Sequence, residues 1–250
     1  PNNSRSFFNS PNTTGLFTET YINSSKGVYS MNFDLTEDQT MMRDMFARFL
    51  DENSSMDRVR AAQSTGFDQA LWSGLAELGA LSIRVPEQSG GLGLGLFDAT
   101  ILMEEAGRTL VSGPLAEVLV AARLMAQLGE EGNSSALEQL VSGASIVSIA
   151  FQSIDETPVQ WIAGGAVAEA VIARRGSDIV LVSIPENACG GEPDLGFTAL
   201  AELDLSAYPQ AVLSSNDQGL SDFGAAIEEW KLLIAAQLSG LARQALKMAA

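Results

Sequence analysis

The residues best suited to acid–base chemistry are two pairs of adjacent glutamates, Glu104–Glu105 and Glu228–Glu229. Two carboxylates that share one site can divide acid and base roles, because their mutual repulsion separates their pKa values. Both pairs lie in segments with helical periodicity, in which neighbouring side chains point about 100° apart. We therefore expect no dyad that shares a proton. The first pair is predicted to have a capping or structural role, and the second to favour the N-terminal end of a helix through its dipole.

A second candidate is the glycine-rich stretch RVPEQSGGLGLG at 84–95. Glycine-rich turns ahead of a helix can cradle phosphates with their backbone N–H groups. A dinucleotide fingerprint could start at Gly93, but Asp98 stands where its third glycine belongs and helical patterns flank the stretch on both sides. We predict a compact loop, in which glycines allow positive φ and close backbone approach, followed by a helix that begins near Asp98.

Two adjacent arginines, Arg174 and Arg175, follow a run of β-forming residues. They could meet the phosphate of a nucleotide ligand through their guanidinium groups, but adjacent arginines near a turn more often form a solvated surface pair.

The composition excludes several other chemistries. The chain of 250 residues has no histidine, which argues against catalytic triads and most zinc sites, so no metal is expected. The formal net charge of -17 argues against binding to nucleic acid or to an anionic membrane surface. The single cysteine, Cys189, cannot form an internal disulfide and indicates a reducing, cytoplasmic compartment. Glu117, Arg123 and Gln127 interrupt the apolar stretch 116–128, so no membrane span is expected.

These residues must be positioned by elements that the sequence pattern indicates. Residues 1–30 have no sustained period and are predicted to be a disordered tail or an upstream extension before Met31. Thr36 and Gln39 have capping-box spacing ahead of an amphipathic helix. Residues 31–143 are expected to form a helical domain, with further helices at 68–78, 97–108, 114–128 and 134–141.

The second half of the chain has a different pattern of residue types. Runs rich in Val and Ile, divided by turn-forming residues, predict a small β domain over residues 144–222. Helical periodicity returns at Phe223 and continues to Ala250 without a C-terminal capping signal, so we expect the sequence to stop inside a helix.

Three motifs follow one another in the N-terminal half: W-x-x-L-A-E-L-G at 72–79, V-P-E-x-x-G-G-L-G-L at 85–94 and M-E-E-A-G-R-T-L at 103–110. In this order and at this spacing they resemble the N-terminal helical domain of the acyl-CoA dehydrogenase family. The stretches that begin at Leu137 and Gly240 are similar to the family's step into its β domain and to the first long helix of its C-terminal domain.

The resemblance covers residues 31–250 and implies a multidomain α+β fold. An all-α N-terminal domain would be followed by a small barrel-like or sandwich-like β domain and, over 223–250, by the first helix of a C-terminal bundle that is truncated here. The glycine loop would then shape one wall of the acyl-CoA site.

Enzymes of this family use FAD to remove hydrogen from Cα and Cβ of an acyl-CoA thioester, while a carboxylate takes the α proton. The resemblance therefore implies an oxidoreductase that forms a trans-2-enoyl-CoA and passes electrons to an electron-transfer flavoprotein. The shortened β domain looks most like that of divergent bacterial members. Those members assemble with a second dehydrogenase-like subunit in the breakdown of fatty acids or sterol side chains.

The same resemblance points to Phe151, Gln152 and Trp161 as cofactor-binding residues. Residues 151–155 stand where the family has a Thr-Glu-Pro-x-x-Gly-Ser-Asp type segment, but the Gly-Ser pair is missing. The sequence W-I-A-G-G at 161–165 is similar to a Trp-Ile-Thr motif, with Ala163 in place of the Thr whose hydroxyl would reach the flavin. Trp161 could stack on a flavin or pack in the core.

The resemblance places the catalytic Glu of most members beyond residue 250. One branch has it ten residues before the glycine that matches Gly240, a position held here by Trp230. Glu229 precedes that position and becomes a substitute base only if the start of the helix is shifted, because one residue rotates a helical side chain by about 100°.

These departures leave two other readings open. The chain would be a non-catalytic partner subunit of a heteromeric acyl-CoA dehydrogenase with a degenerate flavin site, or an acyl-CoA oxidase or flavin monooxygenase on the same fold.

Overall fold

The computed structural model describes residues 34–129, 134–185, 196 and 198–250. The chain divides into two compact units, Pro1–Thr36 and Glu37–Ala250, and the description below concerns the second unit. The tail expected at 1–30 and Cys189 lie outside the described residues.

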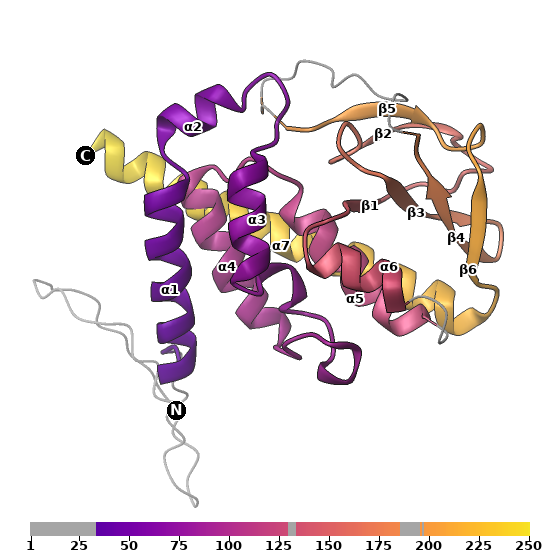
Figure 1. Ribbon diagram of the computed structural model, residues 1–250, viewed down its shortest axis with the longest axis horizontal. Coiled ribbons are helices and arrows are strands. Elements are labelled where there is room, and N and C mark those ends of the chain that lie inside the picture. Colours follow the sequence, from indigo (N-terminus) through magenta and orange to yellow (C-terminus); the bar gives the residue numbers. More distant parts are fainter. Residues whose placement is uncertain (1–33, 130–133, 186–195, 197) are drawn as a thin grey trace, which may run out of the picture. The chain divides into compact units, whose positions relative to one another are not determined.

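The first part of this unit is helical, as predicted (Figure 1). Its helices are α1 (Glu37–Asn53), α2 (Met56–Ala61), α3 (Gln69–Glu77), α4 (Leu96–Thr109), α5 (Leu115–Leu128) and α6 (Ser134–Val141), with short 3-10 helices η1 (Ala80–Ser82) and η2 (Glu87–Ser89). The ranges expected for α3 to α6 agree with the structure to within one residue at each end, whereas α2 was not predicted.

The start of α4 differs from the expectation at Asp98. The helix begins at Leu96 after the N-cap Gly95, and the Asp98 carboxylate accepts the backbone N–H of Gly95 at 2.8 Å. The other oxygen of the same carboxylate accepts from Gln39 of α1 at 2.9 Å. Asp98 therefore stabilises the first turn from inside the helix and joins it to α1.

Two small sheets form the middle part and confirm its sandwich-like character. The larger sheet has the strand order β1-β3-β4-β6, with bounds Val147–Ile149, Ala170–Arg175, Asp178–Ser183 and Gln210–Ser214. Its β1–β3 pair is parallel and the other pairs are antiparallel. The smaller sheet pairs β2 (Val159–Ile162) with β5 (Ala201–Asp204).

The larger sheet is covered by protein on both faces. Side chains of a strand point alternately to the two faces, so successive residues pack in different cores. Along β3, Ala170 and Ile172 belong to the core shared with the helices, whereas Val171 and Ala173 pack in the core between the two sheets. A strand buried on both faces needs apolar residues at successive positions. This requirement accounts for the unbroken Val and Ile runs of the sequence.

The long helix α7 (Asp217–Ala249) begins six residues before the expected start at Phe223. Its N-cap is Asn216, whose side chain accepts the backbone N–H of Gly219 at 2.8 Å. The polar sequence around Asn216 resembles a turn, and its capping function becomes visible only in the structure. The helix runs beside α4 and α5 (Figure 1).

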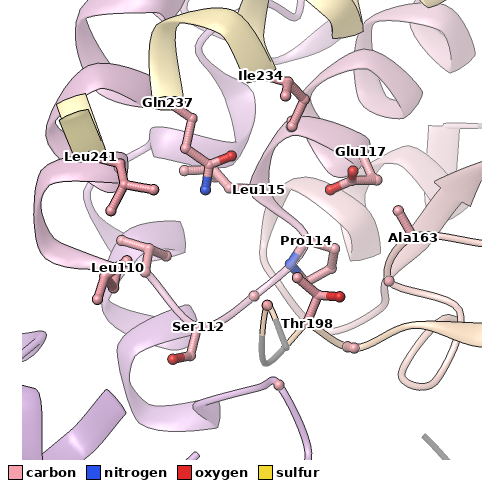
Figure 2. Close-up of a pocket in the computed structure, with 18 of the residues that line it drawn as sticks. Leu110, Ser112, Pro114, Leu115, Glu117, Ala163, Thr198, Ile234, Gln237 and Leu241 are labelled. Carbon is pink, nitrogen blue, oxygen red and sulfur yellow. The ribbon is translucent and has the colours of Figure 1, made fainter. Parts of the chain in front are cut away.

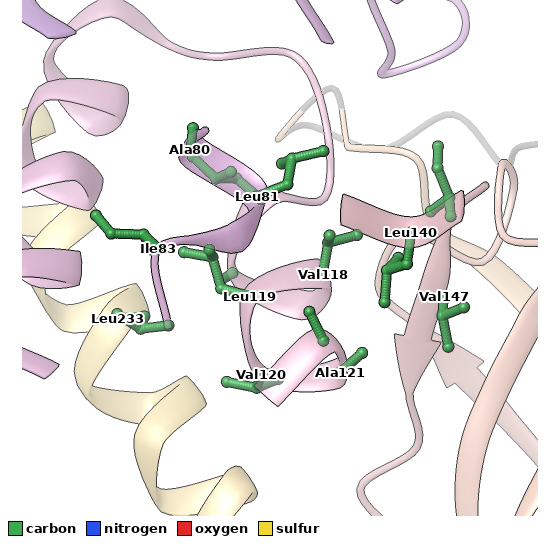
Figure 3. Packing of buried hydrophobic residues seen from close by; sticks show 14 of the residues in the cluster. Ala80, Leu81, Ile83, Val118, Leu119, Val120, Ala121, Leu140, Val147 and Leu233 are labelled. Carbon is green, nitrogen blue, oxygen red and sulfur yellow. The ribbon is translucent and has the colours of Figure 1, made fainter. Parts of the chain in front are cut away.

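The helix α5 lies at the centre of the main core, where its side chains meet those of η1, β1 and α7 (Figure 3). Every residue from Leu115 to Ala122 is buried, as expected for a helix surrounded by protein on all sides. No helix among the described residues combines the length and the apolar composition that crossing a membrane requires.

Candidate functional site

A cavity of about 380 Å³ lies between the α4–α5 connection, α5, α7 and the turn after β2 (Figure 2). Its volume is within the range of about 300–1,000 Å³ that is usual for small-molecule sites. Much of its wall is apolar and includes Leu110, Pro114, Leu115, Ala163, Ile234 and Leu241. Such a wall suits a hydrocarbon ligand, because burial is worth about 0.8 kcal/mol for each methylene group.

Leu110 and Gly164, which both line the cavity, have a positive φ angle. Leu110 ends α4 in the left-handed conformation, with φ of 57°, at a position usually taken by glycine. This conformation costs a residue with a side chain about 1–2 kcal/mol, and here it accompanies a leucine that lines the cavity. Gly164, in the turn after β2, has a φ of 72° and lies so close to Pro114 that a Cβ on it would be 2.6 Å from the proline ring.

A buried carboxyl group, that of Glu117, also lines the cavity. Its residue is only 6% exposed, and burial raises the pKa of the carboxyl above its ordinary value. The indole N–H of Trp230 donates to Glu117 Oε1 at 2.8 Å and opposes part of this pKa shift, because it favours the ionised form. Burial and the indole N–H thus act on the pKa of this carboxyl in opposite directions, and burial is the larger influence.

Trp230 occupies the position at which the resemblance to acyl-CoA dehydrogenases would place the base of one branch of that family. Besides its bond to Glu117, its ring packs against that of Phe151, with ring centroids 4.3 Å apart and planes inclined at 46°. The side chain therefore joins the cavity to the first segment of the β region. An indole cannot take a proton from a substrate, so Trp230 itself is no base.

Glu229 is held by two arginines and does not line the cavity. Arg84 donates to its two oxygens at 2.7 and 3.1 Å, and Arg123 makes a further short bond to it. The carboxylate is 4% exposed. These contacts give no support to Glu229 as a substitute base. The expected helix-dipole role is also wrong, because α7 begins well before this residue, at Asp217.

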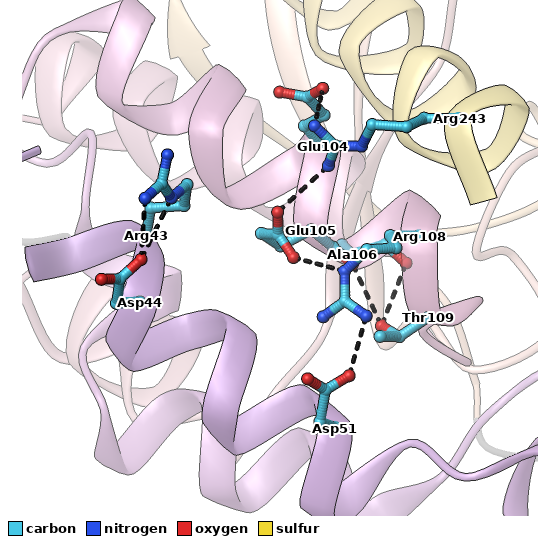
Figure 4. Close-up of polar contacts among 9 residues, drawn as sticks. All are labelled: Arg43, Asp44, Asp51, Glu104, Glu105, Ala106, Arg108, Thr109 and Arg243. Atoms are coloured by element: carbon cyan, nitrogen blue, oxygen red, sulfur yellow. Dashed lines mark hydrogen bonds and ion pairs between the residues drawn. The ribbon is translucent and has the colours of Figure 1, made fainter. Parts of the chain in front are cut away.

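The other glutamate pair has the structural role that was predicted (Figure 4). Arg243 of α7 contacts Glu104 at 2.7 Å and Glu105 at 3.1 Å. Arg108 joins Glu105 to Asp51 of α1. The pair therefore connects three helices and has no place in the cavity.

The glycine loop closes on itself and leaves no phosphate cradle. The backbone N–H groups of residues 91–94 all donate to carbonyl groups of residues 82–86, at distances of 2.8–3.1 Å. Gly90 and Gly93 have positive φ, and a Cβ on Gly91 would overlap Val85. The loop is architectural, as predicted, and its residues do not line this cavity, so the cavity gives no support to the expectation that the loop shapes a wall of the acyl-CoA site. It instead holds Arg84, which donates to Leu94 O at 2.7 Å.

The proposed cofactor residues are not brought into one site. Phe151 and Gln152 line a second cavity, of about 400 Å³, beside the first half of α7. Trp161 lines neither of these cavities and is 50% exposed on β2, which excludes the reading that places it in the core.

The resemblance implies a bound flavin, but the described residues at the expected flavin site offer it a poor fit. The backbone N–H and carbonyl groups of Gln152 both bond to the side chain of Gln160, each at 3.3 Å. The hydroxyl of Ser153 donates to Arg174 O at 3.4 Å. Ala163 supplies no hydroxyl, and its carbonyl already accepts from Ser148. The polar groups that would contact a flavin here are thus absent or already bonded within the protein.

Arg174 and Arg175 behave as a partly solvated pair. Arg174 lines the second cavity and lies 3.6 Å from Glu156, and Arg175 contacts Asp178 and Gln210. Their guanidinium groups therefore face protein acceptors at the sheet surface.

Comparison with known proteins agrees with this architecture. Residues 36–144 match the family model "Acyl-CoA dehydrogenase, N-terminal domain". The acyl-CoA dehydrogenase IpdE2 of Mycolicibacterium smegmatis is 29% identical over 218 residues, which are 86% of this chain and 64% of the relative.

Two solved structures have the same fold. A variant of the steroid acyl-CoA dehydrogenase Tcur3481–Tcur3483 has a TM-score of 0.70 at 23% identity, over 85% of this chain and 65% of the other. The ChsE4–ChsE5 complex of Mycobacterium tuberculosis has a TM-score of 0.68 at 22% identity, over 87% of this chain and 67% of the other.

Residues 36–144 therefore correspond to the N-terminal domain of acyl-CoA dehydrogenases, and the chain shares its fold with the two solved structures. The chain spans 64% of the length of the curated relative and about two thirds of each solved structure.

Sequence reasoning missed Glu117 and Gln237 as cavity residues. Glu117 was noted only as an interruption of an apolar run, yet a charged residue inside such a run must find a partner or a site when its helix is buried. Gln237 carries no comparable signal, since a polar residue on a long amphipathic helix is ordinary.

Proposed function

We propose that this chain is a subunit of an acyl-CoA dehydrogenase and that it binds the acyl part of an acyl-CoA thioester. The observation that carries the proposal is the cavity of about 380 Å³ whose largely apolar wall is built by α5, α7 and the α4–α5 connection. A saturated acyl chain would gain free energy there from each buried methylene group. The charged CoA moiety would remain outside, because the chain offers no general positive field to attract phosphates.

The reaction we assign to the assembled enzyme is α,β-dehydrogenation of the acyl-CoA to a trans-2-enoyl-CoA, with FAD as cofactor and an electron-transfer flavoprotein as acceptor. Within that assembly, we assign the flavin and the catalytic base to a second, different dehydrogenase-like subunit. The internal bonding of Gln152 and Ser153 and the ion pairs of Glu229 support this division. The similarity to the ChsE4–ChsE5 complex favours a heteromeric arrangement of the same kind.

The half-exposed Trp161 favours one competing function, in which this subunit holds flavin itself. An exposed indole next to Ala163, which borders the cavity, could stack on a flavin ring. The two functions differ in whether the chain binds flavin without a partner.

Acyl binding can be tested with a matched pair of variants. Ala163→Leu places extra bulk on the cavity wall, whereas Ala235→Leu makes the same change on the exposed face of α7, outside the cavity. We expect calorimetric titration to show octanoyl-CoA binding to the wild type and to Ala235→Leu with equal affinity. Ala163→Leu should bind about tenfold more weakly, which corresponds to about 1.4 kcal/mol.

Equal affinity for octanoyl-CoA and for CoA alone would contradict the proposal, because the acyl chain would then contribute nothing. Unchanged binding by Ala163→Leu would place the acyl chain elsewhere.

A further inference from the structure

The cavity to which we assign the acyl chain is lined by polar side chains that a plain hydrocarbon would not need, among them Glu117, Gln237, Ser112 and Thr198. Glu117 enters from α5 and Gln237 from α7, and both line the cavity. Figure 2 shows the carboxyl group of Glu117 and the amide of Gln237 directed into the same space. The two polar groups thus come from two different helices that both line the site.

The fold uses only part of their hydrogen-bonding capacity. Trp230 donates to Oε1 of Glu117, and an indole N–H can only donate, so this contact occupies one carboxyl oxygen. Within the described parts of the chain, the side-chain amide of Gln237 makes no hydrogen bond to another residue. Gln237 is half-buried, and among the described residues one oxygen of the buried Glu117 carboxyl has no side-chain donor, so a ligand in the cavity would remove water from both groups. Loss of that water is costly unless the ligand offers a hydrogen-bond partner in its place.

We propose that Glu117 and Gln237 recognise an oxygen function, a hydroxyl or keto group, on the acyl chain, so that the cavity selects oxygenated acyl-CoA thioesters over plain alkanoyl-CoA. This inference rests on the proposed function, because it assumes that the acyl chain occupies the cavity.

The chemistry of the two groups suits such a ligand. Burial favours the neutral form of the Glu117 carboxyl by raising its pKa, and a neutral acid donates one O–H bond. The Gln237 amide can donate and accept. A hydroxyl or keto oxygen between the helices would satisfy both groups, whereas an alkyl chain would desolvate them and leave them unpaired. Sites built to pair with a polar substrate group reject the analogue that lacks it far more strongly than apolar pockets reject a missing methylene.

The test uses the full chain and a defined set of probes: octanoyl-CoA and octanoyl-CoA derivatives that carry one hydroxyl or one keto group at successive carbons. We expect the wild type to bind at least one oxygenated probe about tenfold more tightly than octanoyl-CoA. Glu117→Leu and Gln237→Leu should each reduce this preference to about twofold, mainly by binding octanoyl-CoA more tightly. Glu117→Gln should keep the preference, because an amide also donates to an oxygen and can still accept from Trp230.

Gln237→Leu keeps the test decisive if Glu117→Leu disturbs the core, since the Gln237 amide supports no other described residue. Thermal unfolding of each variant checks that it is folded. Binding of octanoyl-CoA at least as tightly as every oxygenated probe, or an unchanged preference in Gln237→Leu, would overturn the inference and leave the proposed function standing. Absence of binding by every acyl-CoA would overturn both.

Discussion

Glu117 and Glu229 are both buried carboxyl groups, and their surroundings give them different roles. Glu229 faces two guanidinium groups, so its charge is compensated and fixed in place. Glu117 faces an apolar cavity and one indole N–H, so burial opposes its charge. The first residue is therefore part of the architecture, whereas the second is available to a ligand.

Replacement of Glu229 should be costly for stability. Glu229→Gln leaves Arg84 and Arg123 with uncompensated charges in a mostly buried place, and we expect a loss of about 3–5 kcal/mol in the free energy of unfolding. Glu228→Gln is the matched control, because Glu228 is exposed and pairs only with Lys231, and its change should remain within about 0.5 kcal/mol. Urea denaturation measures both values. Similar small losses in the two variants would show that the ion pairs around Glu229 carry little stability.

Ionisation of Glu117 should contribute to the pH dependence of the free energy of unfolding. Its folded-state pKa is raised above the ordinary value of 4.5, so the folded state binds its proton more tightly than the unfolded state does. This residue's contribution to the free energy of unfolding therefore falls as the pH rises from about 4.5 towards the folded-state pKa. Wild type should lose stability relative to Glu117→Gln across that window, as measured by unfolding at a series of pH values. A constant difference between the two proteins would contradict the raised pKa.

At the scale of elements, the crossing of α4 and α7 depends on two glycines. A Cβ on Gly107 would overlap the carbonyl oxygen of Gln237, and a Cβ on Gly240 would overlap that of Glu104. The two glycines thus let the helix backbones approach closely. This approach places Gln237 of α7 beside the cavity and Arg243 beside its two glutamates.

Replacement of glycine by alanine should have opposite effects on stability at two positions of α7, Gly240 at the crossing and Gly224 away from it. Gly240→Ala forces the helices apart, and we expect it to destabilise the protein by about 1–3 kcal/mol. Gly224→Ala has open space around its new methyl group and should stabilise the protein by about 0.5–1 kcal/mol, because alanine favours a helix interior. Thermal unfolding gives the sign of each change. A neutral Gly240→Ala would mean that the crossing tolerates a wider separation.

Much of the fold could be predicted from the sequence, but few residues of the cavity could. The helices α3 to α6 follow from apolar periodicity and capping residues, which are local properties. The start of α7 was missed because Asn216 lies in a polar stretch that reads as a turn. The cavity and the pairing of Glu229 depend on how α5 and α7 meet, which is a tertiary property that no local pattern contains. The interruption of the apolar run at Glu117 was the one local signal of the site.

At the scale of the whole molecule, the chain has a largely apolar cavity to which we assign the acyl group, and its described residues offer few free polar groups to a flavin. The match of residues 36–144 to the N-terminal domain of acyl-CoA dehydrogenases, the cavity and the internal bonding of Gln152 and Ser153 are the observations behind our proposal of a role beside a second dehydrogenase-like subunit. Flavin binding distinguishes the two possibilities: a self-sufficient enzyme would bind flavin alone, whereas a subunit of the proposed kind would need its partner.

The most direct test is a visible absorbance spectrum of the full-length protein, purified alone and after co-expression with a dehydrogenase-like partner. We expect colourless protein alone, and a yellow complex whose flavin is bleached by an acyl-CoA. Yellow protein without a partner, bleached by the same acyl-CoA, would contradict the division of roles between two subunits and establish a self-sufficient dehydrogenase.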